Sequence, residues 1–286
     1  MRTVPTCADP TVGDLRPAGL AELRAALTSL ADRVPDADGA RVRELHQATV
    51  RCLEVTTGPE PRGSILYVHG GAFCLLRADP YAKMAGHLAR ATGYRVLLPD
   101  YRLPPEDPYP TPLLDVVAAY ASLEPPFVLG GDSAGANRAL AAVGLARELG
   151  LAVPALVVLF SPWLDLALGA PSVASNASVD TELDPATLAS YARAYAGGIA
   201  LDHPCVSPRR VGRLPFPPVL VLAGEDEILR DDAVAFAEDA RSRGVDVTLE
   251  IAPRMQHNFP FWGPLVPEAM RAYETVAQRI ARLEHA

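Results

Sequence analysis

Residues 130–135 read GGDSAG, directly after the apolar run 127–129 and directly before an alanine-rich stretch with helical spacing. Glycines two positions on either side of Ser133 let the backbone turn sharply without a Cβ clash. Such a turn lifts the serine hydroxyl out at the end of a strand, where a substrate carbonyl can reach it. A serine hydroxyl is a weak nucleophile at neutral pH, so this interpretation requires a base and an oxyanion site elsewhere in the chain.

Apolar runs typical of strands alternate with helical patterns on both sides of this turn. We expect strands at 48–55, 64–68, 94–99, 127–129, 155–160, 218–222 and 245–251, and helices at 81–91, 113–123, 134–149, 185–196, 231–243 and 264–283. This alternation predicts an α/β fold with a mostly parallel, doubly wound sheet.

The alternation lapses over residues 163–212, where one helix but no convincing strand is expected. We interpret this segment as a cap inserted above the carboxyl ends of the strands, where ligands of such sheets bind. The catalytic core is then 48–162 together with 213–286, and residues 1–47 supply N-terminal cap helices. Apolar residues that share one face of an N-terminal helix are Leu20, Leu23, Ala26, Leu27 and Leu30.

The sequence HGGAF at residues 69–73 follows an expected strand directly. Its glycines let the main chain approach a substrate with unshielded N–H groups, although an ordinary turn is the alternative. We predict that the N–H groups of Gly70, Gly71 and Ala134 form an oxyanion hole. Loss of one such donor typically costs about 2.7–4 kcal/mol of transition-state stabilisation.

Carboxylates gather just past the expected strand 218–222, in AGEDE at 223–227. We predict that Asp226 is the partner of a catalytic imidazole, because it lies in the loop just beyond the strand. Asp231 and Asp232 suit the N-terminus of the following helix instead. A neighbouring acid of the same cluster is the alternative to Asp226.

Of the six histidines, only His257 lies on a loop after the last expected strand. It is therefore the predicted base, whereas His69 is expected to brace the oxyanion turn. The predicted triad runs Ser133, Asp226, His257 along the chain, an order unlike that of chymotrypsin or subtilisin.

Together, six motifs resemble the hormone-sensitive-lipase-like family of α/β-hydrolase esterases, also called the bacterial type IV esterases. They are HGGAF at 69–73, DYRLPPE at 100–106, GDSAGAN at 131–137, SPWLDL at 161–166, AGEDEILRDDA at 223–233 and MQHNF at 255–259. The resemblance runs over nearly the whole chain from about residue 48. The family often has a third glycine where this chain has Ala72, and its acid motif often reads Asp-Pro-Leu.

The resemblance implies an α/β-hydrolase fold with a mobile helical cap, and the triad and oxyanion hole named above. It implies a serine carboxylesterase that hydrolyses small carboxylic esters with short to medium acyl groups and uses no cofactor. Related esterases commonly pair through the last strand and helix, so a homodimer is a further expectation.

Aromatic and apolar residues near the motifs are expected to line the pocket, with plain core packing as the alternative for each. These predicted wall residues are Phe73, Trp163, Leu164 and Phe259.

Other functions share these residues. An acyltransferase or an amide deacylase acting on a small natural product would form the same acyl-enzyme and differ only in the acceptor or the bond that is cleaved. A non-catalytic small-molecule receptor is a more distant alternative, because such proteins typically lose part of the triad.

The 286 residues carry a formal net charge of −8, which argues against a nucleic-acid partner or stable association with an anionic membrane. The N-terminus lacks the apolar run of a signal peptide. No stretch approaches the roughly 18 apolar residues of a membrane helix. We therefore expect a cytoplasmic protein whose partner is a small-molecule ester. The four cysteines lack metal-ligand spacing, so no metal site is expected.

Overall fold

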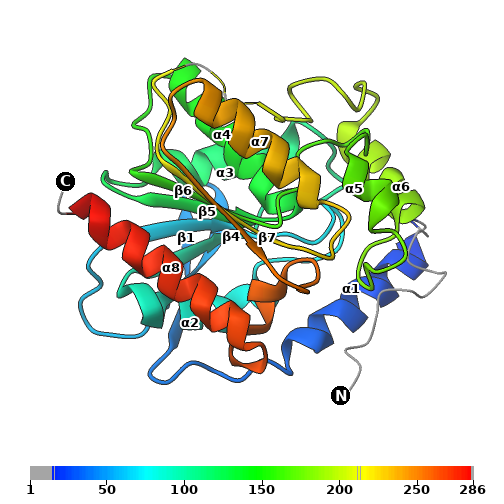
Figure 1. Cartoon of the computed structure of the whole chain (residues 1–286). Helices are drawn as coiled ribbons and strands as arrows, with labels where there is room; N and C mark the ends of the chain where they lie inside the picture. Colours follow the sequence, from blue (N-terminus) through cyan, green and yellow to red (C-terminus); the bar gives the residue numbers. More distant parts are fainter. Residues whose placement is uncertain (1–14, 16, 211, 213, 285–286) are drawn as a thin grey trace.

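One large, mostly parallel sheet runs through the middle of the molecule (Figure 1), in a computed structural model that describes residues 15, 17–210, 212 and 214–284. The eight strands lie in the order β1-β2-β4-β3-β5-β6-β7-β8, and only the β1–β2 and β2–β4 pairs are antiparallel. Their bounds are β1 (Arg41–Gln47), β2 (Val50–Thr56), β3 (Ser64–Val68), β4 (Arg95–Pro99), β5 (Val128–Asp132), β6 (Leu156–Phe160), β7 (Val219–Gly224) and β8 (Val247–Ala252). The predicted α/β fold is confirmed.

Helices cover both faces of the sheet, which is why its central strands are buried along their whole length. One face packs against α3 (Thr111–Ala121), α4 (Ala134–Glu148) and α7 (Arg230–Ser242). The other packs against α2 (Ala82–Thr92) and α8 (Pro267–Glu284), with the short helices η1 (Asp79–Tyr81) and η2 (Phe259–Leu265) beside them. Among the described residues, no helix combines the length and apolar character that a bilayer span would require.

The N-terminal part of the chain differs from the expected set of cap helices over 1–47. The helix α1 (Pro17–Ala31) is present, but residues 41–47 form strand β1 and pair with β2. Most of β1 is exposed, so its charged sequence RVRELHQ lacks the apolar alternation of a half-buried strand. The expectation for residues 1–14 and 16 lies outside the described residues.

The inserted segment 163–212 contains α5 (Pro171–Ser175) and α6 (Pro185–Ala196) and no strand among its described residues. It shares an apolar cluster with α1 and with the loop after β3, in which Leu188 and Tyr195 meet Leu20 and Phe73. In Figure 1, α1, α5 and α6 lie together at one side of the sheet. The helix α1 and the segment 163–212 therefore pack together although they are far apart in the sequence.

Two glycines of helix α4 predict opposite effects of the same substitution. A Cβ on Gly135 would lie 2.0 Å from the Val68 carbonyl oxygen, whereas a Cβ on Gly144 would meet nothing within 4 Å. We expect Gly135→Ala to lower the free energy of unfolding in urea by roughly 3 kcal/mol or more, because backbone must move. Gly144→Ala should raise it by roughly 0.5–1 kcal/mol through helix propensity. Similar effects of both variants would contradict the close packing of α4 on β3.

Candidate active site

The predicted chemical groups follow strands whose carboxyl ends meet at one edge of the sheet. The HGGAF turn follows β3, Ser133 follows β5, the acidic cluster follows β7, and His257 lies beyond β8. Because these four strands run parallel, four loops distant in sequence come together in space.

Ser133 occupies a strained turn between β5 and α4, with φ of 50° and ψ of −123°. Its N–H donates to the Phe160 carbonyl (2.9 Å), and its carbonyl accepts from the N–H of Trp163 (3.1 Å). A non-glycine residue at positive φ costs about 1–3 kcal/mol, and such conformations persist only where the surroundings impose them. The turn therefore has the strand–turn–helix geometry of a nucleophile elbow.

His257 contacts Glu227, not Asp226. The imidazole Nδ1 lies 2.7 Å from Glu227 Oε2, and the Glu227 side chain is fully buried. Its other oxygen, Oε1, accepts a hydrogen bond from the N–H of Gly224 (3.0 Å). Asp226 is partly exposed, and its N–H bonds to the Met255 carbonyl.

This finding corrects the prediction of Asp226 as the imidazole partner. The loop after β7 turns so that the residue at 227 points inward, and the longer Glu side chain reaches His257. Three consecutive acids follow Gly224, and sequence position alone does not reveal which of them points toward the imidazole. The direction of each acidic side chain depends on how this loop packs against the loop after β8, to which Asp226 bonds through its N–H.

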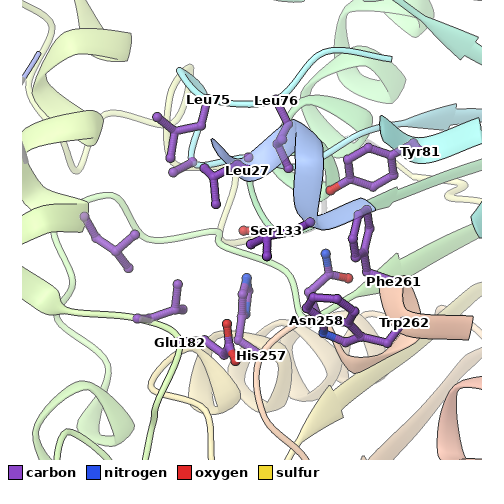
Figure 2. A pocket seen from close by; sticks show the side chains of 15 residues that line it. Leu27, Leu75, Leu76, Tyr81, Ser133, Glu182, His257, Asn258, Phe261 and Trp262 are labelled. Atoms are coloured by element: carbon purple, nitrogen blue, oxygen red, sulfur yellow. The ribbon is translucent and has the colours of Figure 1, made fainter. Parts of the chain in front are cut away.

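The charge of Glu227 controls the proton affinity of His257. Burial lowers the pKa of His257, but the hydrogen bond to Glu227 and the charge of that carboxylate raise it, and the net pKa is above its usual 6.5. The bond at Nδ1 leaves Nε2 as the nitrogen that faces away from Glu227. Figure 2 shows the imidazole pointing toward Ser133.

Asp132, directly before Ser133, is fully buried and connects three loops. Its Oδ1 accepts a hydrogen bond from the N–H of Gly70 (3.0 Å). Its Oδ2 accepts from the Tyr81 hydroxyl (2.7 Å) and from the side-chain amide of Asn258 (2.6 Å). Burial raises the pKa of Asp132 to about 6, against the lowering effect of its hydrogen bonds. Sequence reasoning did not single out Asp132, although it is part of the GDSAGAN motif.

The direction of the Gly70 N–H corrects the predicted oxyanion hole. This N–H points back into the protein, toward Asp132 and the Tyr81 hydroxyl, so it is not available to a ligand. Gly71 and Ala72 line the cleft instead, and neither N–H has an acceptor among the described residues. Ala134 begins helix α4, where the first N–H groups have no partner within the helix. The geometry thus favours donors at 71, 72 and 134.

His69, at the start of the turn after β3, is buried against Tyr101. Its ring stacks on Tyr101 with centroids 4.1 Å apart, and its Nδ1 lies 2.9 Å from the Tyr101 hydroxyl. Burial lowers the pKa of His69 to about 3, so this ring is neutral at physiological pH. It therefore serves the turn as a structural group, as the sequence analysis expected.

An apolar cleft of about 840 Å³, including its solvent-filled mouth, opens above Ser133 and His257 (Figure 2). Six leucines contribute to its wall, two each from α1, from the loop after β3 and from the segment 163–212, and η2 supplies two aromatic rings. The lining residues are Leu27, Leu30, Gly71, Ala72, Leu75, Leu76, Tyr81, Ser133, Glu182, Leu183, Leu188, His257, Asn258, Phe261 and Trp262.

The four predicted wall residues do not line this cleft. They are at most 4% exposed and pack in the interior; Phe73, for example, stacks on Tyr195 at 4.0 Å between ring centroids. The correction follows from side-chain direction, since a residue beside a motif can point below the site as easily as into it. The apolar face of α1 was the available signal, because it contains Leu27 and Leu30.

The site combines Ser133, His257 and Glu227 with the backbone N–H groups at 71, 72 and 134. Such a set is suited to nucleophilic acyl chemistry. No group of three or more His, Cys, Asp or Glu side chains in the described part of the chain is arranged to hold a metal ion.

Comparison with known proteins gives a consistent result. A family model described as "alpha/beta hydrolase fold" matches residues 65–261. An acetyl-hydrolase of Streptomyces hygroscopicus is 38% identical over 217 residues, which are 74% of this chain and 73% of that protein. An esterase of Acinetobacter venetianus is 31% identical over 269 residues, which are 92% of this chain and 89% of that protein. The crystal structure of an esterase from the bacterial hormone-sensitive lipase family, 32% identical, matches with a TM-score of 0.89 and covers 96% of this chain and 95% of that chain.

The contact between His257 and Glu227 predicts which acid controls the imidazole. We expect Glu227→Gln to lower the pKa of His257, because it removes the negative charge that stabilises the protonated ring. Asp226→Asn is the matched control and should change this pKa much less. The measurement is an NMR titration of the His257 ring proton signals; a larger shift in Asp226→Asn than in Glu227→Gln would contradict the assignment.

Proposed function

Since the chain belongs to the α/β-hydrolase family, we propose that Ser133, His257 and Glu227 act together as its catalytic triad. The protein is a serine hydrolase that acts on carboxylic esters. The observation that carries the residue assignment is the 2.7 Å contact between His257 Nδ1 and Glu227 Oε2, beside a cleft that Ser133 and His257 both line.

In the proposed reaction, Glu227 holds the Nδ1–H tautomer and leaves Nε2 free to accept a proton. Ser133 Oγ attacks the ester carbonyl while His257 Nε2 takes the hydroxyl proton. The imidazolium then donates this proton to the leaving alcohol, and an acyl-enzyme remains. Water, activated by the same imidazole, cleaves the acyl-enzyme and restores the serine.

The negative charge on the tetrahedral intermediate requires donors that are already in place. We assign this role to the N–H groups of Gly71, Ala72 and Ala134, since the N–H of Gly70 is bonded to Asp132. Donors in a cleft lined mainly by apolar side chains act more strongly than the same groups in bulk water. Gly71 has φ of 112°, and a Cβ there would lie 2.7 Å from the backbone nitrogen of Leu76. The position therefore requires glycine.

The composition of the cleft supports esters with short to medium acyl groups. Most of its lining is apolar, as is usual in sites for small molecules. The relative named acetyl-hydrolase supports acetyl as one such acyl group.

An acyltransferase or amide deacylase remains the alternative with the same acyl-enzyme. Product analysis with an added alcohol or amine, and a comparison of acetate esters with the corresponding acetamides, separates these reactions. A non-catalytic receptor is disfavoured by the formed contact between His257 and Glu227.

Four statements about the surroundings of the enzyme stay predictions from the sequence. They are a homodimer through the last strand and helix, the absence of a nucleic-acid partner, the absence of stable membrane association, and a cytoplasmic location. Strand β8 lies at one edge of the sheet, which leaves it available for the proposed pairing.

The nucleophile assignment predicts that Ser133→Ala lowers kcat for p-nitrophenyl acetate by about 10³-fold or more and abolishes labelling by a fluorophosphonate probe. Ser242→Ala, an exposed serine at the end of α7, is the matched control and should keep both activities. Full turnover or labelling in Ser133→Ala would refute the proposed function.

A further inference from the structure

Among the carboxylate, lysine and arginine side chains of the described residues, the cleft lining contains a negative charge and no positive one. Of the described residues that line it, Glu182 alone is acidic, and none is lysine or arginine. The other residues of the cap that line the cleft, Leu183 and Leu188, are apolar. A carboxylate in such a wall has few polar neighbours to replace the water that it loses on burial.

Glu182 is held in this position by its backbone. Its N–H and that of Leu183 donate to Oδ1 of Asp180, at 2.8 and 2.9 Å. The other oxygen of Asp180 accepts from the N–H of Ile228 (2.8 Å), which directly follows Glu227. The turn that carries Glu182 is therefore fixed to the loop that carries the imidazole partner.

The Glu182 side chain points into the cleft next to His257 (Figure 2). No described residue donates a hydrogen bond to its carboxylate or forms an ion pair with it. Burial and the charge of Asp180 raise the pKa of Glu182, the proximity of His257 lowers it, and the net pKa is above its usual value. Within the part of the chain that the structure describes, this carboxylate therefore has no hydrogen-bond or ion-pair partner, and its half-buried position leaves it accessible to a ligand.

We propose that Glu182 is a specificity-determining residue that selects esters whose alcohol part bears a cationic group. This inference rests on the proposed function. The acyl groups proposed for this cleft are short to medium in length and apolar, so we assign the charged group to the alcohol half of the ester. A cation beside Glu182 gains an attraction that is stronger in an apolar cleft than in bulk water. An anionic ester is repelled by the same carboxylate.

An isosteric pair of thioesters isolates the charge. Acetylthiocholine carries a quaternary ammonium group, and 3,3-dimethylbutyl thioacetate carries a neutral group of the same shape. We expect the wild-type protein to prefer the cation in kcat/KM by about tenfold, and Glu182→Gln to abolish this preference, mainly through KM for the cation. Because Glu182 also lies next to His257, turnover of the neutral thioester serves as the reference, and the decisive quantity is the ratio of kcat/KM between the two thioesters.

Glu148→Gln is the matched control, because it removes the same charge from the far end of α4. At 1.5 Å per helical residue, this position lies about 20 Å from Ser133. It should retain the tenfold preference. Choline and 3,3-dimethyl-1-butanol, compared as ligands by NMR, provide a reading of the same contact that does not depend on turnover.

Two results would overturn the proposal. One is an equal loss on both thioesters in Glu182→Gln, which would show that Glu182 acts through His257 and not on the substrate. The other is a wild-type protein that cleaves p-nitrophenyl acetate but does not prefer the cationic thioester or ligand. If the wild-type protein did not cleave p-nitrophenyl acetate at all, this result would contradict the proposed function. The comparison of choline with 3,3-dimethyl-1-butanol as ligands would still decide the role of Glu182.

Discussion

The active site depends on the hydrogen bonds that the buried carboxylate of Asp132 accepts. It accepts hydrogen bonds from Gly70, in the turn after β3, and from Asn258, in the loop that carries His257. These bonds join both loops to the turn that carries Ser133. Burial raises the pKa of Asp132 from 3.8 to about 6, so the folded protein binds its proton more tightly than the unfolded chain does. The free energy of unfolding therefore falls as the pH rises between these values. At neutral pH the ionised carboxylate therefore lowers the free energy of unfolding, while its hydrogen bonds hold three loops in one arrangement.

The parts that could be predicted from sequence are those that local chemistry determines. The glycines around Ser133 and the apolar run before it specify a strand, a sharp turn and a helix, and the structure contains β5, the elbow and α4. Helix 185–196 and strand 64–68 match their expected bounds, because proline or glycine marks one end of each. His257 was found because a histidine on the loop after the last strand lies at the edge where the other chemical groups meet.

The parts that could not be predicted depend on the direction of a side chain or an N–H group. Glu227 and Asp226 are neighbours in sequence, and only the packing of two loops places the former against His257. The N–H of Gly70 points inward because Asp132 lies below it. The leucines of α1 line the cleft because that helix packs beside the cap. Each of these facts requires contacts between segments that are far apart along the chain.

A double-mutant cycle between Asp132→Asn and Asn258→Gly, read in kcat/KM for p-nitrophenyl acetate, tests most directly whether this carboxylate holds the base loop. Glycine tolerates the φ of 52° at position 258, so the second variant removes the amide group without backbone strain. We predict that each single variant lowers kcat/KM by about tenfold, and that the double variant is little worse than Asp132→Asn alone. Losses that simply multiply would show that the two side chains act independently, and would contradict the central role given to Asp132.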